Sequence, residues 1–275
     1  MTAAAALLAS VAWGVADFLG GLKSRVVPTI VVLLLAQVSG VLAIALVVAI
    51  AGNAPPGPSI LWASLAGLFG TVGLAAFYRG MAVGSISIVA PIAAVGAVVP
   101  VVFGIATGDD VSRPQFLGFV LALSGVALAS FERHVGEVRV AAGVPWAIAA
   151  VIGFGGYYVP MHEASEQDFL WAALVFRSTV AVLAFAAWLV LRPPVAAARG
   201  HLGAIAMIGI LDTAGNTLFA AAASLGEVSV VSVLATLYPV TTVALAALVL
   251  SERLDRLQLL GVVSALAGVV LISAA

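Results

Sequence analysis

Long apolar runs, each about 20 residues and separated by short polar or Gly- and Pro-containing stretches, dominate this chain. An α-helix needs about 20 mostly apolar residues to cross the hydrocarbon core of a bilayer. Membrane β-strands would be about half as long and would alternate in polarity, and these runs do neither. The pattern predicts ten transmembrane helices, near residues 2–22, 28–51, 59–80, 85–107, 115–131, 144–162, 169–191, 201–223, 228–250 and 257–274.

The composition agrees with a membrane protein and excludes a soluble one. Apolar residues make up 64% of the 275 residues, charged residues make up 8%, and the mean hydropathy is +1.25. Soluble domains carry about 25% charged residues, and a soluble chain this apolar would expose large apolar patches. The loops are too short to fold as domains, so any function must lie within or between the helices.

The few polar residues exclude several kinds of chemistry. The net charge of −1 gives no reason to expect nucleic acid as a partner, and the absence of cysteine excludes disulfides and thiolate metal sites. The three histidines lie in loops or at helix ends and none is paired for zinc, so we expect no metal and no cofactor. No nucleophile–base pair falls within a span and no phosphate-binding loop is present, which argues against an enzyme and against ATP-driven transport.

Lysine and arginine residues are distributed unequally between the loops. Loops after odd-numbered helices hold eight of them, whereas loops after even-numbered helices hold only Arg113. Because positively charged loops tend to stay in the cytoplasm, this bias predicts that both termini lie outside. The eight residues are Lys23, Arg25, Arg133, Arg139, Arg192, Arg199, Arg253 and Arg256.

The two halves of the sequence repeat each other. After a shift of 142 residues, GLFGTVGLAAFYRGMAVGSIS overlies GILDTAGNTLFAAAASLGEVS, which matches Gly73 with Gly215 and Phe77 with Phe219. After a shift of 143, QFLGFVLALSGVALAS overlies QLLGVVSALAGVVLIS with ten identities in sixteen positions. Apolar composition alone does not explain the Gly, Gln and Phe matches. We therefore interpret the chain as a duplication, with five-helix repeats at residues 1–135 and 143–275.

Five helices in each repeat invert the second copy in the membrane relative to the first. Inverted repeats are a recurring transporter architecture, with the substrate held near the midplane between the repeats. The predicted fold class is therefore an all-α integral membrane protein with ten transmembrane helices arranged as two inverted five-helix repeats. A structural membrane subunit without transport is the alternative, and it fits less well because ionisable residues fall within the spans.

Four segments resemble the drug/metabolite transporter superfamily, specifically proteins with two EamA-like domains: AWGVADFLGG, FYRGMAVGSISIVAPIAAV, LATLYPVTTVALAALVLSERLDRLQLLG and SALAGVVLI. The resemblance covers nearly the whole chain and implies secondary transport of small metabolites, often export, through a cavity lined by helices 1, 3, 4, 6, 8 and 9. The family's glycine–acid turn resembles Gly108–Asp109 and Ser251–Glu252. Its arginine in the second helix of each half resembles Arg177, with Gln37 at the other position. Family members usually have cytoplasmic termini, opposite to the charge bias here.

Asp17 and Arg79 are charged residues within spans and lie at matching depths in helices 1 and 3. A charge within a span usually faces protein or a water-filled cavity. We expect the two side chains to pair, either as a gate or clamp for a substrate charge or as a static ion pair between helices. Snorkelling of Arg79 to the interface is a further alternative.

Asp212 lies near the middle of helix 8, where a carboxylate is most costly. Asn216 and Phe219 follow at helical spacing, so the three residues share one face. Such a face could bind an ammonium or guanidinium group, or could hold a transported proton. The alternative is a protonated structural residue that bonds to neighbouring hydroxyls.

Aromatic residues recur on helices that the resemblance assigns to the cavity. Aromatic faces beside carboxylates suit organic cations or aromatic amino acids, whereas interfacial belts and packing are the alternative explanation. The candidates for substrate binding are Trp13, Tyr78, Phe154, Tyr157, Tyr158 and Tyr238, in addition to the charged and polar residues above.

Proline and glycine positions predict local distortions and close contacts. Pro91 and Pro100 interrupt helix 4 and Pro239 interrupts helix 9, so these residues are candidate hinges, with static kinks as the alternative. Glycines seven residues apart in helices 5 and 10 predict close helix packing. They are Gly118, Gly125, Gly261 and Gly268.

Arg177 lies a third of the way into helix 7, and we expect a structural pairing with an acid near the same side. The acids at that side are Glu163, Glu166 and Asp168.

The sequence therefore predicts a multi-pass protein of the cell membrane that moves small metabolites by alternating access, with export of amino acids or similar amphiphilic compounds as the first choice. Protons are the candidate coupling ion, and the chain acts as a monomer or homodimer. The alternatives are an uptake permease for an organic cation and, outside transport, an intramembrane enzyme or a structural subunit.

Overall fold

The computed structural model of the chain describes residues 2–54, 57, 59–84, 86–129, 137–249 and 256–274. Every regular element within these ranges is helical. The α-helices are α1 (Thr2–Lys23), α2 (Thr29–Ala51), α3 (Ser59–Val83), α4 (Ile86–Ala94), α5 (Val98–Thr107), α6 (Arg113–Ala129), α7 (Glu137–Ser165), α8 (Phe169–Leu191), α9 (Leu202–Ala223), α10 (Val228–Ala235), α11 (Tyr238–Val249) and α12 (Arg256–Ala274). Short 3₁₀ segments η1 (Val95–Ala97) and η2 (Val195–His201) precede α5 and α9.

The helices have the length and the surface of membrane spans. Six of them are long and apolar enough to cross a bilayer, and shorter apolar helices lie at 92–107, 228–242 and 259–272. Large apolar side chains on the outside are exposed, as at Ile50 and Val190. Lipid tails suit such an apolar surface, because an α-helix bonds its backbone polar groups within itself. The protein is therefore an all-helical membrane protein, while the number of ten spans stays a prediction.

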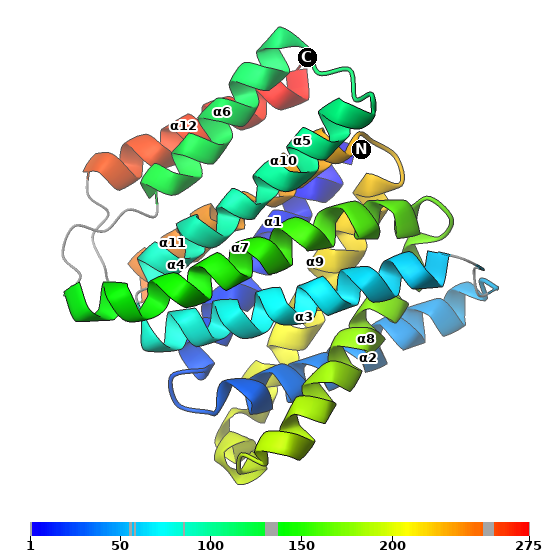
Figure 1. The fold of residues 1–275 in the computed structure, drawn as a ribbon, viewed down its shortest axis with the longest axis vertical. Coiled ribbons are helices and arrows are strands. Elements are labelled where there is room, and N and C mark those ends of the chain that lie inside the picture. The colour runs from blue at the N-terminus through cyan, green and yellow to red at the C-terminus, as the bar shows by residue number, and fades with distance from the viewer. Residues whose placement is uncertain are drawn as a thin grey trace.

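Most helix pairs join a helix of the first half to a helix of the second half, and the pairing follows the repeat. α3 packs along α7 and α1 along α9, while α2 lies beside α8 and α6 beside α12. Figure 1 shows α6 and α12 side by side at one edge of the bundle, and α2 and α8 at the opposite edge. A central group formed by α1, α3, α7 and α9 lies between these two pairs, and it contains helices from both halves.

The glycines predicted to bring two helices together do so between α6 and α12. A Cβ atom added at Gly118 would lie 2.9 Å from the carbonyl oxygen of Gly268. One added at Gly125 would lie 2.7 Å from the carbonyl oxygen of Gly261. The backbones of the two helices therefore meet at a distance that only glycine permits, and this prediction is confirmed.

Two predicted spans are interrupted. The span at 85–107 divides into α4, η1 and α5, and the span at 228–250 divides at Thr236–Leu237 into α10 and α11. The second break falls directly before Pro239, which has no backbone N–H to continue a helix. Pro100 is buried in α5, and the side chain of Pro91 lies outside the described residues. The breaks agree with the proline positions, and movement at Pro91, Pro100 and Pro239 stays a prediction.

A polar contact ties the end of α5 to the start of α10, and so joins the two halves at one end of the bundle. Gly108 takes a left-handed conformation with a φ of 117° and turns the chain at the end of α5. The next residue, Asp109, accepts hydrogen bonds from the backbone N–H of Ser229 at 3.0 Å and from its hydroxyl at 2.5 Å. A carboxylate at a helix N-terminus satisfies donors that the helix itself leaves free. Asp109 therefore caps α10 from the other half of the chain.

Candidate functional site

A cavity lies between helices of both halves, in the central part of the bundle. Its walls come from α1, α3, α7, α8, α9 and α11, and the space between them is about 420 Å³ including the opening. The lining residues are Trp13, Asp17, Gly70, Leu74, Phe154, Tyr157, Tyr158, Phe176, Asp212, Asn216 and Tyr238. The resemblance assigns helices 1, 3, 4, 6, 8 and 9 to the cavity, and the structure differs from it in two ways. The predicted seventh helix contributes Phe176, and among the described residues the predicted fourth helix contributes none.

Two glycines that match each other in the repeat each lie against a large aromatic ring of the other half. Gly73 of α3 lies against Phe154 of α7, at 2.6 Å from a ring carbon to an added Cβ. Its repeat counterpart Gly215 of α9 lies against Trp13 of α1, at 2.5 Å by the same measure. Each glycine leaves room for an aromatic ring of the other half. The duplication therefore places one large ring on each side of the cavity.

The aromatic residues form two packed groups beside the cavity. Tyr157 lies at the centre of the first group, with ring centroids 5.1 Å from Phe176, 5.3 Å from Tyr158 and 6.2 Å from Trp13. Phe77 lies in the second group, with ring centroids 5.4 Å from Phe154 and 6.1 Å from Tyr238. Most of these pairs meet edge to face, which is the favoured geometry of aromatic pairs. Members of both groups line the cavity and make much of its wall aromatic.

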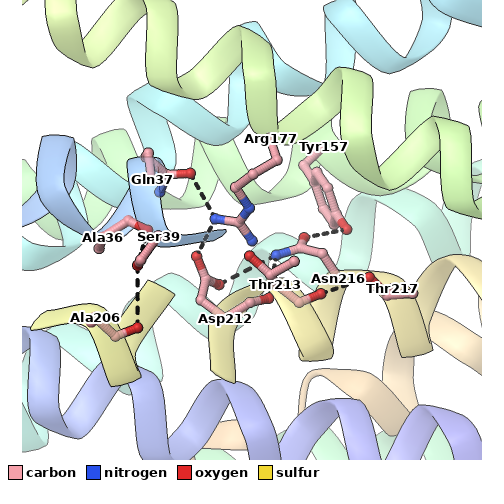
Figure 2. Close-up of polar contacts among 10 residues, drawn as sticks. All are labelled: Ala36, Gln37, Ser39, Tyr157, Arg177, Ala206, Asp212, Thr213, Asn216 and Thr217. Carbon is pink, nitrogen blue, oxygen red and sulfur yellow. Dashed lines mark hydrogen bonds and ion pairs between the residues drawn. The ribbon is translucent and has the colours of Figure 1, made fainter. Parts of the chain in front are cut away.

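Arg177, Asp212 and Gln37 form a fully buried polar network beside the cavity (Figure 2). The Nη1 atom of Arg177 donates to Oδ2 of Asp212 at 2.6 Å and to Oε1 of Gln37 at 2.8 Å. The three residues come from α8, α9 and α2, so the network joins the two halves of the chain. A buried carboxylate needs such a partner to remain ionised. The charge of Asp212 is therefore balanced within the protein.

Asn216 and Tyr157 extend this network along the cavity wall (Figure 2). The amide nitrogen of Asn216 donates to the backbone oxygen of Asp212 at 2.7 Å and to its Oδ1 at 3.3 Å. The hydroxyl of Tyr157 donates to Oδ1 of Asn216 at 2.7 Å. Asp212 and Asn216 thus share one face of α9, as the sequence predicts, and their polar groups are used within the protein.

Asp17 differs from Asp212 in having no counter-ion among the residues that the structure describes. Its side chain is only 5% exposed and lines the cavity. Within the described part of the chain, the one ion pair is Arg177–Asp212, and no hydrogen bond to the Asp17 carboxylate is found. The lining residues thus carry two carboxylates, and the adjacent arginine balances one of them. The cavity wall therefore contains one carboxyl group, that of Asp17, without a partner among the described residues.

The predicted pairing of Asp17 with Arg79 is wrong. Arg79 is exposed, whereas Asp17 is buried in the cavity wall. The reason is helical phase, because Tyr78 turns inward and the next residue along a helix points about 100° away.

Tyr78 and Phe219 are buried among the aromatic residues without lining the cavity, Tyr78 beside Phe77 and Phe219 beside Trp13.

The predicted pairing of Arg177 with an acid at the end of helix 6 or the start of helix 7 is also wrong. Asp168 caps α8 by accepting from the backbone N–H groups of Leu170 and Trp171, while Arg177 points inward to Asp212. One sequence signal for this arrangement was available. The family resemblance assigns Gln37 and Arg177 to the same position in the second helix of each half, and the two side chains meet in the structure.

The described residues contain no group of three or more His, Asp or Glu side chains able to hold a metal ion. The site instead has a mostly apolar cavity between helices of two related halves, with Asp17 as the lining carboxyl group that has no partner among the described residues. Transporters built from two repeats hold their substrates at such an interface.

Comparisons with known proteins agree with this class. The EamA-like transporter family matches residues 1–131 and again residues 141–274. The chain belongs to the EamA-like transporter family, whose members are membrane transporters rather than enzymes. None of the curated proteins matches the sequence. A solved structure titled only "Crystal structure of protein" has the same fold, with a TM-score of 0.79 and 16% identity over 98% of this chain and 96% of that one.

Proposed function

We propose that the protein is a secondary active transporter that moves small amphiphilic amines, amino acids among them, across the cell membrane by alternating access, in the direction of export. The observation that carries the proposal is the central cavity, which combines an aromatic wall with the unbalanced carboxylate of Asp17. A solute with an ammonium group and an apolar or aromatic body matches both features.

Alternating access requires two halves that move against each other around the site. Two features support this movement. The cavity is lined by residues of both halves, and the span that contributes Tyr238 to its wall is broken into α10 and α11. The corresponding span of the first half is also broken, into α4, η1 and α5. An inverted arrangement of the two repeats would make the inward- and outward-facing states mirror each other, with Pro91, Pro100 and Pro239 at the hinges.

Protons are the proposed coupling ion. Asp17 is a carboxylate in a buried cavity, and it is stable there when it holds either a substrate cation or a proton. Because one carboxylate accepts only one of the two, binding of the substrate releases the proton. All walls of the cavity come from one chain, so a monomer is sufficient for transport, and a homodimer would contain two separate sites.

Uptake of an organic cation is the second candidate function. It is favoured by the same missing counter-ion at Asp17, because a quaternary ammonium needs only a carboxylate and aromatic faces. The two functions differ in the substrate groups that they require and in direction. A permease for organic cations would accept choline-like compounds, and an exporter of amino acids would not.

Flux in liposomes that contain only this protein tests the proposal. Liposomes loaded with labelled L-phenylalanine should release it faster when a proton gradient is imposed, and unlabelled L-phenylalanine should compete. Labelled choline in parallel liposomes distinguishes the second candidate. If the folded protein moves neither compound with or without a gradient, the carrier function is contradicted.

A further inference from the structure

The polar groups that line the cavity divide into those satisfied within the protein and those that are not. Tyr157 donates its hydroxyl to Asn216 at 2.7 Å. The hydroxyl of Tyr158 pairs with that of Thr236 at 3.0 Å. Asp212 is held by Arg177. These groups therefore have little capacity left for a ligand.

The hydroxyl of Tyr238 is different, because it is buried and has no hydrogen-bond partner among the described residues. Its side chain is 3% exposed and lines the cavity that also contains Asp17. Buried tyrosine hydroxyls usually find a partner, and leaving one unsatisfied is unfavourable. A group on the ligand can supply the missing partner.

The position of Tyr238 is fixed by its surroundings. It begins α11 directly after the break at Thr236–Leu237. Its ring meets Phe77 edge to face at a centroid distance of 6.1 Å, and meets Phe154 at 6.5 Å. A hydroxyl held by packed rings has a defined direction, so it can select a ligand by the place of one atom.

Other buried polar atoms also lack a partner, and they lie outside the cavity wall. These atoms are Nε and Nη2 of Arg177, Nδ1 of His162 and the hydroxyl oxygens of Ser24, Thr29, Thr213 and Ser232. Arg177 and Thr213 lie behind the wall against α2, where an added Cβ at Gly40 would meet both of them. None of these other residues lines the cavity, whereas Tyr238 does.

We propose that Tyr238 is a specificity-determining residue that donates a hydrogen bond to an oxygen atom of the substrate, while Asp17 holds the ammonium group of the same molecule. This inference rests on the proposed function and defines its substrate class more closely. The preferred substrates carry an amine with a neighbouring carboxylate or hydroxyl, as aromatic amino acids and amino alcohols do. Simple arylalkylamines lack the oxygen and leave the Tyr238 hydroxyl unsatisfied.

Three probes of nearly equal shape separate these classes: L-phenylalanine, L-phenylalaninol and phenethylamine. The KM for transport of each probe is measured in liposomes for three purified proteins: the wild type, Tyr238→Phe and the control Ser165→Ala. Ser165 is a matched control because its buried hydroxyl bonds to Met161 within α7, away from the cavity. For Tyr238→Phe we expect a KM about tenfold higher for the two oxygen-bearing probes and no change for phenethylamine. Ser165→Ala should behave as wild type.

An equal change for all three probes would overturn the inference, because it would show a structural role for Tyr238. An unchanged KM for all three would overturn it as well. Should Tyr238→Phe fail to fold, the wild type alone decides, since an equal KM for phenylalaninol and phenethylamine contradicts oxygen recognition. Absence of any flux by the folded wild type would instead contradict the proposed function, and this inference with it.

Discussion

The guanidinium of Arg177 and the carboxylate of Asp212 form an ion pair of 2.6 Å in which the arginine is completely buried. The pair connects α8 to α9, and Gln37 of α2 holds the same arginine nitrogen at 2.8 Å. It therefore joins the two halves of the chain beside the cavity. The pair also balances the charge of Asp212 within the protein, which leaves Asp17 as the lining carboxyl group without a partner among the described residues.

Loss of one partner of this ion pair should destabilise the protein strongly. Asp212→Asn leaves the buried Arg177 charge uncompensated, and breaking a buried pair from one side costs about 3–5 kcal/mol. The double variant Asp212→Asn with Arg177→Met removes both charges and should recover much of that loss. Reversible unfolding in mixed micelles measures the three free energies.

Glu166→Gln is the matched control, because Glu166 is an exposed acid near the start of α8. Surface substitutions change stability by about 0.5 kcal/mol or less. If Asp212→Asn were no more destabilising than Glu166→Gln, the ion pair would have no structural role. Asp212 would then be available to bind a proton or a substrate cation, as its place in the sequence suggests.

The contact between Asp109 and Ser229 should hold one end of the bundle closed. Asp109→Ala removes the cap of α10, which costs about 0.5–2 kcal/mol. It should therefore favour the state in which α5 and α10 separate. A single cysteine at Ala6, which is buried in the first turns of α1, reports this opening by its reaction with a water-soluble maleimide.

The chain has no cysteine of its own, so this labelling has no background. Ala6→Cys with Asp109→Ala should react several-fold faster than Ala6→Cys alone. Asp110→Ala is the control, since Asp110 contacts Glu227 through its backbone N–H and the substitution keeps that bond. Equal rates in all three proteins would show that the contact does not control access.

The orientation in the membrane follows from the loop charges and stays a prediction. With both termini outside, cysteines introduced singly at Gly136 and Ala197 face the cytoplasm and should resist an impermeant thiol reagent in intact cells. A cysteine at Ala54 should react. Reaction at the first two positions together with protection at Ala54 would give the orientation usual for the family. Gly136 lies outside the described residues, whereas Ala197 is exposed.

Local patterns in the sequence predicted the features that depend on local structure. Runs of apolar residues located the helices, and glycines seven residues apart predicted the contact of α6 with α12. Helical spacing also placed Asp212 and Asn216 on one face. In each case the physical cause acts within one helix or within a repeated pattern, so the sequence alone contains it.

Contacts between distant helices were not predictable in the same way. Arg177 is 140 residues from Gln37 and 35 from Asp212, and the nearby acid Glu166 is the more obvious partner in the sequence. Depth in the membrane matched Asp17 with Arg79, but depth does not give the direction of a side chain around its helix. That direction follows from the packing of α1 and α3 with the rest of the bundle, which needs the structure.

The most direct test of the account is the binding of an amine by Asp17. Titration of purified protein with phenethylamine, in which one carboxylate and the aromatic wall are the only contacts required, should give saturable binding that weakens as the pH is lowered, because protons compete for the same carboxylate. Asp17→Asn should abolish this binding and its dependence on pH while the protein stays folded. Binding of equal strength by Asp17→Asn across the same pH range would contradict the central claim.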